Sequence, residues 1–286
     1  MIELNKIYNE DCLEGMKRIP DGSVNLVVTS PPYDNLRKYG GVGSSLCFEK
    51  FKDVALEIKR VLAKGGVCVW IVSDGCENGS ESGTSFRQAL YFKECGLNLY
   101  DTMIWEKPSP SAPTEGRYYD VFEYMFVLCK GSKPTHLNLI ADHENISVGS
   151  VSTCETRSCA EDRKQTGRKR VVKERCRRFN VWKISRDQNK TGHPAVYPFR
   201  LARDHIISWS NEGDTVLDPF IGSGTTAIAS IREKRNFIGF ELNKEYYDKA
   251  CKRIMLEQAQ LTLFCLKKQQ ISRTTLIFRV ICVIRC

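Results

Sequence analysis

Short apolar runs that alternate with amphipathic segments are the feature that most limits how this chain can fold. Val24–Thr29, Val67–Val72 and Thr215–Asp218 each have the length and composition of a buried strand. Phe51–Leu62 and Tyr197–Trp209 carry apolar residues at helical spacing. Because strands that alternate with helices form βαβ units, the pattern predicts an α/β fold with a mostly parallel sheet and helices on both faces.

The same patterns extend along most of the chain and fade in one place. Further strands are expected at 3–9, 97–105, 121–129 and 236–240, and further helices at 11–19, 84–95, 225–231 and 243–256. Between residues 131 and 191 the periodicity is lost and polar and basic residues dominate. We therefore expect one α/β domain in two halves, 1–130 and 192–262, with an insert at 131–191 and a basic tail at 263–286.

The insert concentrates the positive charge of the chain. Lys and Arg total 43 against 34 Asp and Glu, a formal net charge of +9, and residues 157–190 alone hold thirteen basic and four acidic residues. This favours nucleic acid as a partner, because Lys and Arg neutralise phosphates and the interleaved Phe179 and Trp182 can stack on bases; a solvated charged loop is the alternative. The candidate DNA-binding residues are Arg168, Lys169, Arg170, Lys173, Arg175, Arg177 and Arg178.

Other classes of protein are excluded by composition. The N-terminus lacks the apolar stretch of a signal peptide, and no apolar run approaches the roughly 20 residues that cross a bilayer. The thirteen cysteines are scattered without a Cys-x-x-Cys pair, so we expect reduced thiols in a cytoplasmic protein. A zinc site has loose spacing and no tight ligand pair, so we expect no metal. The ligands considered for such a site are His143, Cys154, Cys159 and Cys176.

The loop from Asp218 to Thr226, Asp-Pro-Phe-Ile-Gly-Ser-Gly-Thr-Thr, lies between a strand and a helix. Its glycines, Gly222 and Gly224, allow a tight turn and close approach of backbone to a ligand. Glu241, seventeen residues after Gly224, ends the next strand, where a carboxylate can accept hydrogen bonds from both hydroxyls of a ribose. The loop predicts an adenosine-type cofactor, with a dinucleotide or a glycine turn without ligand as alternatives.

A second loop, Thr29-Ser30-Pro31-Pro32-Tyr33, also follows a strand. Its chemistry suits an exocyclic amine of a nucleobase, whose nitrogen lone pair is delocalised into the ring. Ser30 Oγ and the carbonyl of Pro31 can accept the two N–H groups, and Tyr33 offers a ring against which an extruded base stacks. Taken alone, the loop is better explained as a rigid Pro-Pro turn.

Together the two loops resemble those of the amino-methylating DNA methyltransferases, which act on N4 of cytosine or N6 of adenine. Ser30-Pro31-Pro32-Tyr33 resembles the family's catalytic tetrapeptide, and the segment Asp218–Thr226 resembles its methyl-donor loop. Other matching segments are Asn9–Leu13 near the cofactor adenine, Gly192–Pro194 with Pro198, Phe199 and Leu201 beside the cofactor, Ile104–Pro108 at the target-base pocket, and Glu123–Gly131 before the recognition region.

The resemblance implies a Rossmann-like methyltransferase fold and S-adenosylmethionine as cofactor. The catalytic loop precedes the insert and the donor loop follows it, which resembles the permuted order of the family's β group, with the insert as target-recognition region. The implied cofactor-binding residues are Asp11, Cys12, His193, Pro194, Asp218, Pro219, Phe220, Gly222, Gly224, Thr225 and Glu241.

The implied activity is site-specific methylation of a flipped base in double-stranded DNA. The serine at position 30 favours N4 of cytosine, with N6 of adenine as the alternative. A bacterial or phage origin, a cognate restriction endonuclease and a monomeric or homodimeric state are compatible with the resemblance. The rival hypotheses are a nicotinamide-dependent oxidoreductase, a non-catalytic DNA-binding protein and an RNA methyltransferase. No cysteine nucleophile is needed, so the cysteines take no part in the expected chemistry.

Overall fold

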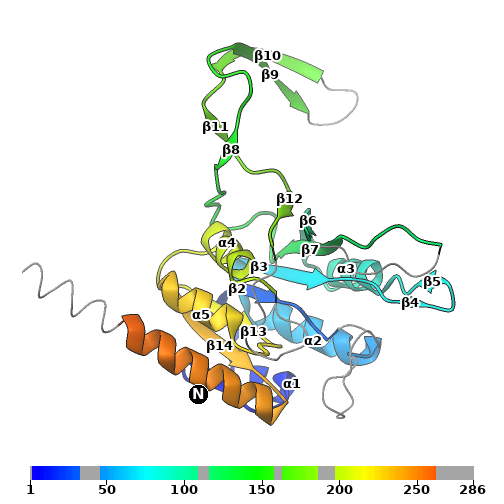
Figure 1. Ribbon diagram of the computed structural model, residues 1–286, viewed down its shortest axis with the longest axis vertical. Coiled ribbons are helices and arrows are strands. Elements are labelled where there is room, and N and C mark those ends of the chain that lie inside the picture. The colour runs from blue at the N-terminus through cyan, green and yellow to red at the C-terminus, as the bar shows by residue number, and fades with distance from the viewer. Residues whose placement is uncertain (1, 33–45, 109–115, 158–162, 186–196, 262–286) are drawn as a thin grey trace, which may run out of the picture.

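The computed structural model describes residues 2–32, 46–108, 116–157, 163–185 and 197–261, with the backbone alone at 77, 152–157 and 163–168. Its centre is an eight-stranded sheet in the order β1-β14-β13-β2-β3-β7-β6-β12 (Figure 1). The strands are β1 Lys6–Tyr8, β2 Val24–Thr29, β3 Leu62–Val72, β6 Asn98–Glu106, β7 Phe122–Cys129, β12 Val181–Lys183, β13 Thr215–Asp218 and β14 Asn236–Phe240.

The sheet is mostly parallel, as the alternation of strands and helices predicts. β1, β14, β13, β2 and β3 run parallel to one another, and β12 runs parallel to β6. β7 is the exception and is antiparallel to both β3 and β6. The chain passes from β6 to β7 without a described helix between them, so the two strands can pair as neighbours of opposite direction.

Helices cover both faces of the sheet, also as expected (Figure 1). On one face, side chains of α1, α2 and α3 pack in a single cluster with Val27, Trp70 and Leu217 of the strands. On the other face, α4 and α5 pack against the alternate residues, including Leu26 and Val28. The helices are α1 Cys12–Met16, α2 Phe48–Val61, α3 Thr84–Glu94, α4 Phe199–Trp209, α5 Thr225–Arg232 and a last one at 244–261.

The region 131–191 is more ordered than its sequence indicates. It contains an antiparallel pair of β8 (His143–Glu144) with β11 (Arg175–Cys176), and a second pair of β9 (Val151–Arg157) with β10 (Arg163–Val171). Figure 1 shows these pairs projecting from the body; we call residues 143–176 the arm. β12, in the same region, is an edge strand of the main sheet, so part of the expected insert belongs to the body.

Smaller differences concern element boundaries. α2 and β3 meet at Val61 and Leu62, so Gly65 and Gly66 lie inside the strand instead of before it. A short hairpin of β4 (Cys76–Glu77) and β5 (Ser80–Glu81) follows β3. Within the described ranges, no helix has the length and apolar character that a bilayer span requires.

Candidate active site

The two chemically distinctive loops leave neighbouring ends of the same sheet. β2 and β13 are adjacent and parallel, with Leu26 opposite Val216 and Val27 opposite Leu217. The chain therefore emerges from both strands at one edge, where parallel α/β sheets bind ligands. Two segments almost two hundred residues apart in sequence are thus brought together.

A buried carboxylate ties these strand ends to each other. Asp218, at the end of β13, is 1% exposed, and Thr29 at the end of β2 donates a hydrogen bond of 2.6 Å to its Oδ1. The backbone N–H of Phe220 donates to the same oxygen at 3.1 Å. Tyr197 donates to Oδ2 at 3.0 Å, and the hydroxyl of Thr226 also donates to Oδ2. Burial raises the pKa of Asp218, although these hydrogen bonds oppose the shift.

The donor loop is shaped by its contacts with neighbouring elements. The ring of Phe220 meets the buried Trp70 edge-to-face, with centroids 6.3 Å apart. The N–H of Ile221 donates to Phe240 O at 3.0 Å. Gly224 caps α5 with a φ of +85°, and a Cβ there would lie 3.2 Å from the Cβ of Ala250. The left-handed backbone therefore favours glycine, and an added Cβ would also need Ala250 to shift by a few tenths of an ångström.

Glu241 ends β14 beside this loop. Its Oε1 accepts a 2.7 Å hydrogen bond from the N–H of Asn243, and its own N–H donates to Tyr8 O at 3.0 Å. Burial raises the pKa of Glu241, and hydrogen bonds from the N–H groups of Asn243 and Gly222 act in the opposite direction. A carboxylate accepts about four hydrogen bonds, so this one retains capacity for ligand hydroxyls.

Asp11 and Cys12, at the start of α1, have structural partners. Asp11 caps the helix by accepting from the N–H of Leu13 at 2.9 Å, and it accepts from Lys50 Nζ at 2.7 Å. Burial opposes its ionisation, but the hydrogen bonds from Lys50 and Leu13 outweigh burial and lower the pKa of Asp11. Burial raises the pKa of the Cys12 thiol to about 12, so this cysteine is a neutral core residue at physiological pH.

Some of the predicted site residues lie outside the described part of the chain. These are Tyr33, His193 and Pro194. Of the remaining tetrapeptide, Pro31 is buried, and Ser30 and Pro32 are half-buried at the end of β2. Pro219, Gly222 and Thr225 lie within the donor loop and the first turn of α5.

Thr29, Tyr197 and Thr226 all bond to Asp218 and hold the site together. Thr29 and Thr226 stand in the two predicted loops but were given no role there, and Tyr197 was expected only as part of a helix. For Thr29 the available signal was a hydroxyl at the end of a buried strand, since a buried polar group needs a partner.

The basic region divides into exposed and buried residues. The side chains of Lys169, Arg170, Lys173, Arg175 and Arg177 are exposed, whereas that of Arg168 is not described. The side chain of Arg178 is only 15% exposed and pairs with two carboxylates. Trp182 is buried and stacks on His205 with centroids 4.5 Å apart, so the prediction that it can stack on bases is wrong. Phe179 is exposed and contacts the ring of His143.

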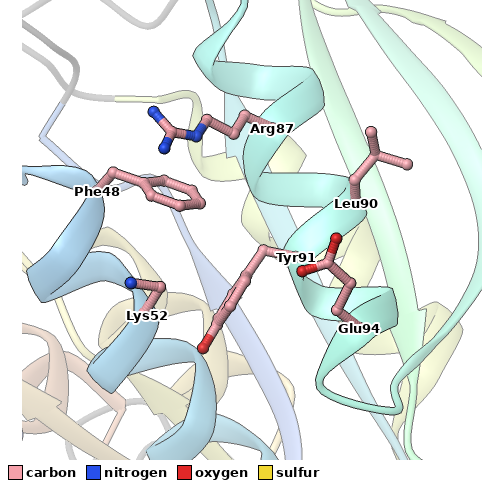
Figure 2. A pocket seen from close by; sticks show the side chains of 6 residues that line it. All are labelled: Phe48, Lys52, Arg87, Leu90, Tyr91 and Glu94. Carbon is pink, nitrogen blue, oxygen red and sulfur yellow. The ribbon is translucent and has the colours of Figure 1, made fainter.

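A pocket elsewhere on the molecule is unrelated to these residues. A surface hollow of about 350 Å³ lies between α2 and α3, lined by Phe48, Lys52, Arg87, Leu90, Tyr91 and Glu94. Figure 2 shows the guanidinium of Arg87 over the ring of Phe48, at 3.6 Å from its centroid. None of the predicted site residues lines it, so we do not assign it to the active site.

The residues considered for zinc are only partly described. His143 and Cys176 face each other across β8 and β11, while the side chain of Cys154 and all of Cys159 lie outside the description. In the described part, no group of three or more His, Cys, Asp or Glu side chains is arranged to hold a metal ion.

An α/β sheet with a glycine-rich turn, an acidic neighbouring strand end and an adjacent Ser-Pro-Pro loop is typical of proteins that bind an adenosine-type cofactor. Comparison with known proteins identifies the family. Residues 24–252 match the N6/N4 family model, described as DNA methylase. The orphan methyltransferase M.BamHII of Bacillus amyloliquefaciens is 46% identical over 247 residues, covering 83% of this chain and 91% of the relative. The type II methyltransferase M.Cfr9I of Citrobacter freundii is 28% identical over 300 residues, covering 91% of each chain.

Solved structures share the fold. A DNA modification methylase from Thermus thermophilus, in complex with S-adenosyl-L-methionine, has a TM-score of 0.58 at 26% identity and covers 88% of this chain and 95% of that chain. The PvuII DNA methyltransferase, named as cytosine-N4-specific, has a TM-score of 0.63 at 22% identity, with coverage of 88% and 90%. The chain belongs to the N6/N4 family of DNA methylases. This finding decides against the oxidoreductase and the non-catalytic DNA-binding protein.

The cofactor of the family is S-adenosylmethionine, and the residues present fit it. Thr225 Oγ1 is a buried side-chain oxygen that has no hydrogen-bond partner among the described residues, at the first turn of α5. A buried hydroxyl without a partner is costly unless a ligand satisfies it. Together with the spare acceptor capacity of Glu241, this hydroxyl is suited to a polar ligand lying along the donor loop.

Proposed function

We propose that this protein is a site-specific DNA methyltransferase that modifies an exocyclic amino group of a flipped base, with N4 of cytosine as the preferred target. The observation that carries the proposal is the hydrogen bond from Thr29 to Asp218, which ties the end of β2 to the end of β13. It supports a single cleft in which Ser30 faces a cofactor held by the donor loop.

Each loop has a distinct task in this proposal. Ser30 Oγ and the Pro31 carbonyl accept the two N–H bonds of the target amine, which frees its lone pair, and Tyr33 stacks on the base. Phe220 and Glu241 hold the cofactor, with Glu241 on the ribose hydroxyls. S-adenosylmethionine, when bound, supplies an electrophilic methyl group. Direct attack by the amine needs no cysteine, which agrees with the neutral, buried thiol of Cys12.

The preference for cytosine over adenine is inferred from a resemblance at Ser30 and not from the hydrogen-bonding chemistry of its hydroxyl. A serine at the first catalytic position resembles the N4-cytosine members, and methylation of adenine N6 is the alternative. The likeness to the PvuII enzyme adds only the fold, because the sequences are 22% identical.

We propose that the DNA is bound by the region 131–191, the target-recognition insert of a permuted, β-group arrangement. The exposed residues Lys169, Arg170, Lys173, Arg175 and Arg177 support this, with Arg168 added from the sequence. They would contact phosphates, while nearby polar side chains read base edges. A cytoplasmic bacterial or phage setting, a partner endonuclease, and a monomeric or dimeric state stay predictions.

The test is transfer of a labelled methyl group from S-adenosylmethionine to duplex DNA, followed by nucleoside analysis. The expected product is N4-methylcytosine, whereas N6-methyladenine would select the alternative. Label on C5 of cytosine, on RNA in preference to DNA, or nowhere despite a folded protein would refute the proposal. Ser30→Ala combined with Tyr33→Ala should abolish transfer and leave cofactor affinity unchanged. Ser23→Ala, an exposed serine just before β2, is the matched control.

A further inference from the structure

The arm joins the body through the segments on either side of it, and Arg178 lies in the second of these, between β11 and β12. The chain enters the arm after Asp142 and leaves it before Arg178, and Figure 1 shows the arm extending away from the sheet. Small movements at this junction are amplified at the far end, which is formed by β9 and β10. The orientation of the arm therefore depends on how firmly the junction is held.

Arg178 links both sides of the junction to the body. Its Nε donates to Asp142 Oδ1 at 3.0 Å, and its Nη1 donates to Asp204 Oδ2 at 2.7 Å. Asp204 belongs to α4 and is 1% exposed. The guanidinium also lies over the ring of Trp182 in β12, 4.9 Å from the centroid. One side chain thus connects the segment that enters the arm, the segment that leaves it, a helix of the body and the edge of the main sheet.

The backbone at the same point adds to this connection. The N–H of Arg178 donates to Ile140 O at 2.9 Å, and the N–H of Ile104 in β6 donates to Asn180 O at 2.8 Å. The hydrogen bond from Arg178 lowers the pKa of Asp142, so the carboxylate is ionised at neutral pH. The planar guanidinium is suited to bridging two carboxylates, which the single ammonium of lysine does less well.

The neighbouring arginine provides the contrast. Arg177 has an exposed side chain, whereas that of Arg178 is 15% exposed and pairs with two carboxylates of the protein, the buried Asp204 and the partly exposed Asp142. Both were predicted to bind DNA from the sequence, where they are indistinguishable. Only Arg177 presents its charge to an external phosphate.

We propose that Arg178 is a positioning residue that fixes the arm against the catalytic body and makes no phosphate contact of its own. This inference rests on the proposed function, in which the arm grips the duplex while the target base enters the cleft beside Ser30. The arm and the cleft must bind the same DNA molecule. The angle of the arm relative to the body therefore sets which base reaches the cleft. The contacts of Arg178 with Asp142, Asp204 and Trp182 are called the clamp. Loss of the clamp reduces the fraction of bound duplexes in which the target base is aligned for methyl transfer.

The first experiment measures DNA binding and turnover by Arg178→Met, with Arg177→Met as the matched variant. Plasmid DNA from a methylation-deficient host is the probe, over about 50 to 200 mM salt. Removing a phosphate contact lowers the slope of log K against log salt by about one, which is expected for Arg177→Met only. Arg178→Met keeps the wild-type slope, while its kcat/KM for DNA falls by about tenfold to a hundredfold and its cofactor affinity is unchanged.

The second experiment follows amide hydrogen exchange without DNA. Arg178→Met should speed exchange at 140–145 and 175–181 and leave β2 and β13 unchanged. Folding is expected to survive, because Arg203 and Arg200 also pair with Asp204, at 3.4 and 3.6 Å. Asp142→Asn is the milder variant should Arg178→Met not fold, since Asp142 is 38% exposed, and it should give the same changes at smaller size.

Two results would overturn the inference. A salt slope lowered by about one in Arg178→Met would make Arg178 a phosphate contact. Unchanged exchange at the junction, in Arg178→Met or in Asp142→Asn, would show that the clamp does not hold the arm. If the wild-type protein transfers no methyl group to any DNA, the proposed function fails, while the exchange experiment still decides whether Arg178 holds the arm.

Discussion

Replacement of Gly224 by alanine tests whether the donor loop depends on this one backbone position. Gly224 caps α5 in the left-handed conformation, with a φ of +85°. Alanine is strained there by roughly 1–2 kcal/mol. Its Cβ would also stand 3.2 Å from Ala250 Cβ, so the helix at 244–261 must shift, which adds about 1 kcal/mol. The expected loss of stability is about 2–3 kcal/mol.

Gly83 is the matched control for this substitution. It caps α3 in the same left-handed region, with a φ of +65°, but a Cβ there meets nothing within 4 Å. Because the change in unfolded-chain entropy is the same at both positions, it cancels in the comparison. Gly83→Ala should therefore cost about 1 kcal/mol less than Gly224→Ala.

Urea unfolding of the two variants and the wild type measures this difference, with constant m-values as the check on two-state behaviour. Calorimetric titration with S-adenosylmethionine gives the functional readout, in which only Gly224→Ala should weaken binding. Equal losses of stability and equal affinities in the two variants would refute the reasoning, since they would mean that contact with Ala250 is irrelevant.

Three further predictions follow from buried polar contacts. Thr29→Val removes one hydrogen bond to Asp218, which should cost about 1–3 kcal/mol in urea unfolding and lower kcat, whereas Thr29→Ser should keep both near wild type. Burial lowers the pKa of His205 to about 3, against 6.5 in the unfolded chain. Between these two pH values only the unfolded chain binds the proton. Stability should fall by roughly 1.4 kcal/mol per pH unit from pH 6.5 toward 3, and His205→Gln should lack this component. Lys107→Met removes the ammonium 3.3 Å from the buried Glu123 and should cost about 3–5 kcal/mol, much of it recovered on adding Glu123→Leu.

The parallel core could be predicted from the sequence because its strands are buried on both faces. β2, β13 and β14 have the bounds expected from their apolar runs. Such strands are continuous apolar runs in the sequence. The residue types of the polar loops between them can be read directly and indicate their chemistry. The adjacency of the two loops followed from a general property of parallel sheets, and the register of β2 and β13 bears it out.

The arm could not be predicted, because its strands carry no apolar pattern in the sequence. β10, Arg163–Val171, is rich in basic residues and forms a ladder with β9 alone, so neither strand shows an apolar alternation. β12 was missed because it has three residues, of which only Trp182 is buried.

The ion pairs of charged residues could not be predicted from the sequence either. Arg177 and Arg178 differ only in tertiary surroundings, since the acidic partners of Arg178 lie 36 and 26 residues away in sequence. Local composition cannot distinguish a solvated arginine from one that bridges two carboxylates. The same holds for Asp218, whose partner Thr29 lies 189 residues away.

The choice of target base can be tested at Ser30 itself. If the first residue of the tetrapeptide decides between cytosine and adenine, Ser30→Asp should move the methyl label to adenine N6. The proposed chemistry predicts otherwise, because a hydroxyl and a carboxylate oxygen each accept one N–H of the amine, and neither discriminates between the two bases. We expect Ser30→Asp to keep the label on cytosine N4 with a reduced kcat, and Ser30→Ala to lose roughly 10²–10³ in kcat. Nucleoside analysis of DNA methylated by each variant measures both outcomes. Appearance of N6-methyladenine with Ser30→Asp would contradict this account and place base selection in the tetrapeptide, whereas retention of N4-methylcytosine would place it in the walls of the pocket.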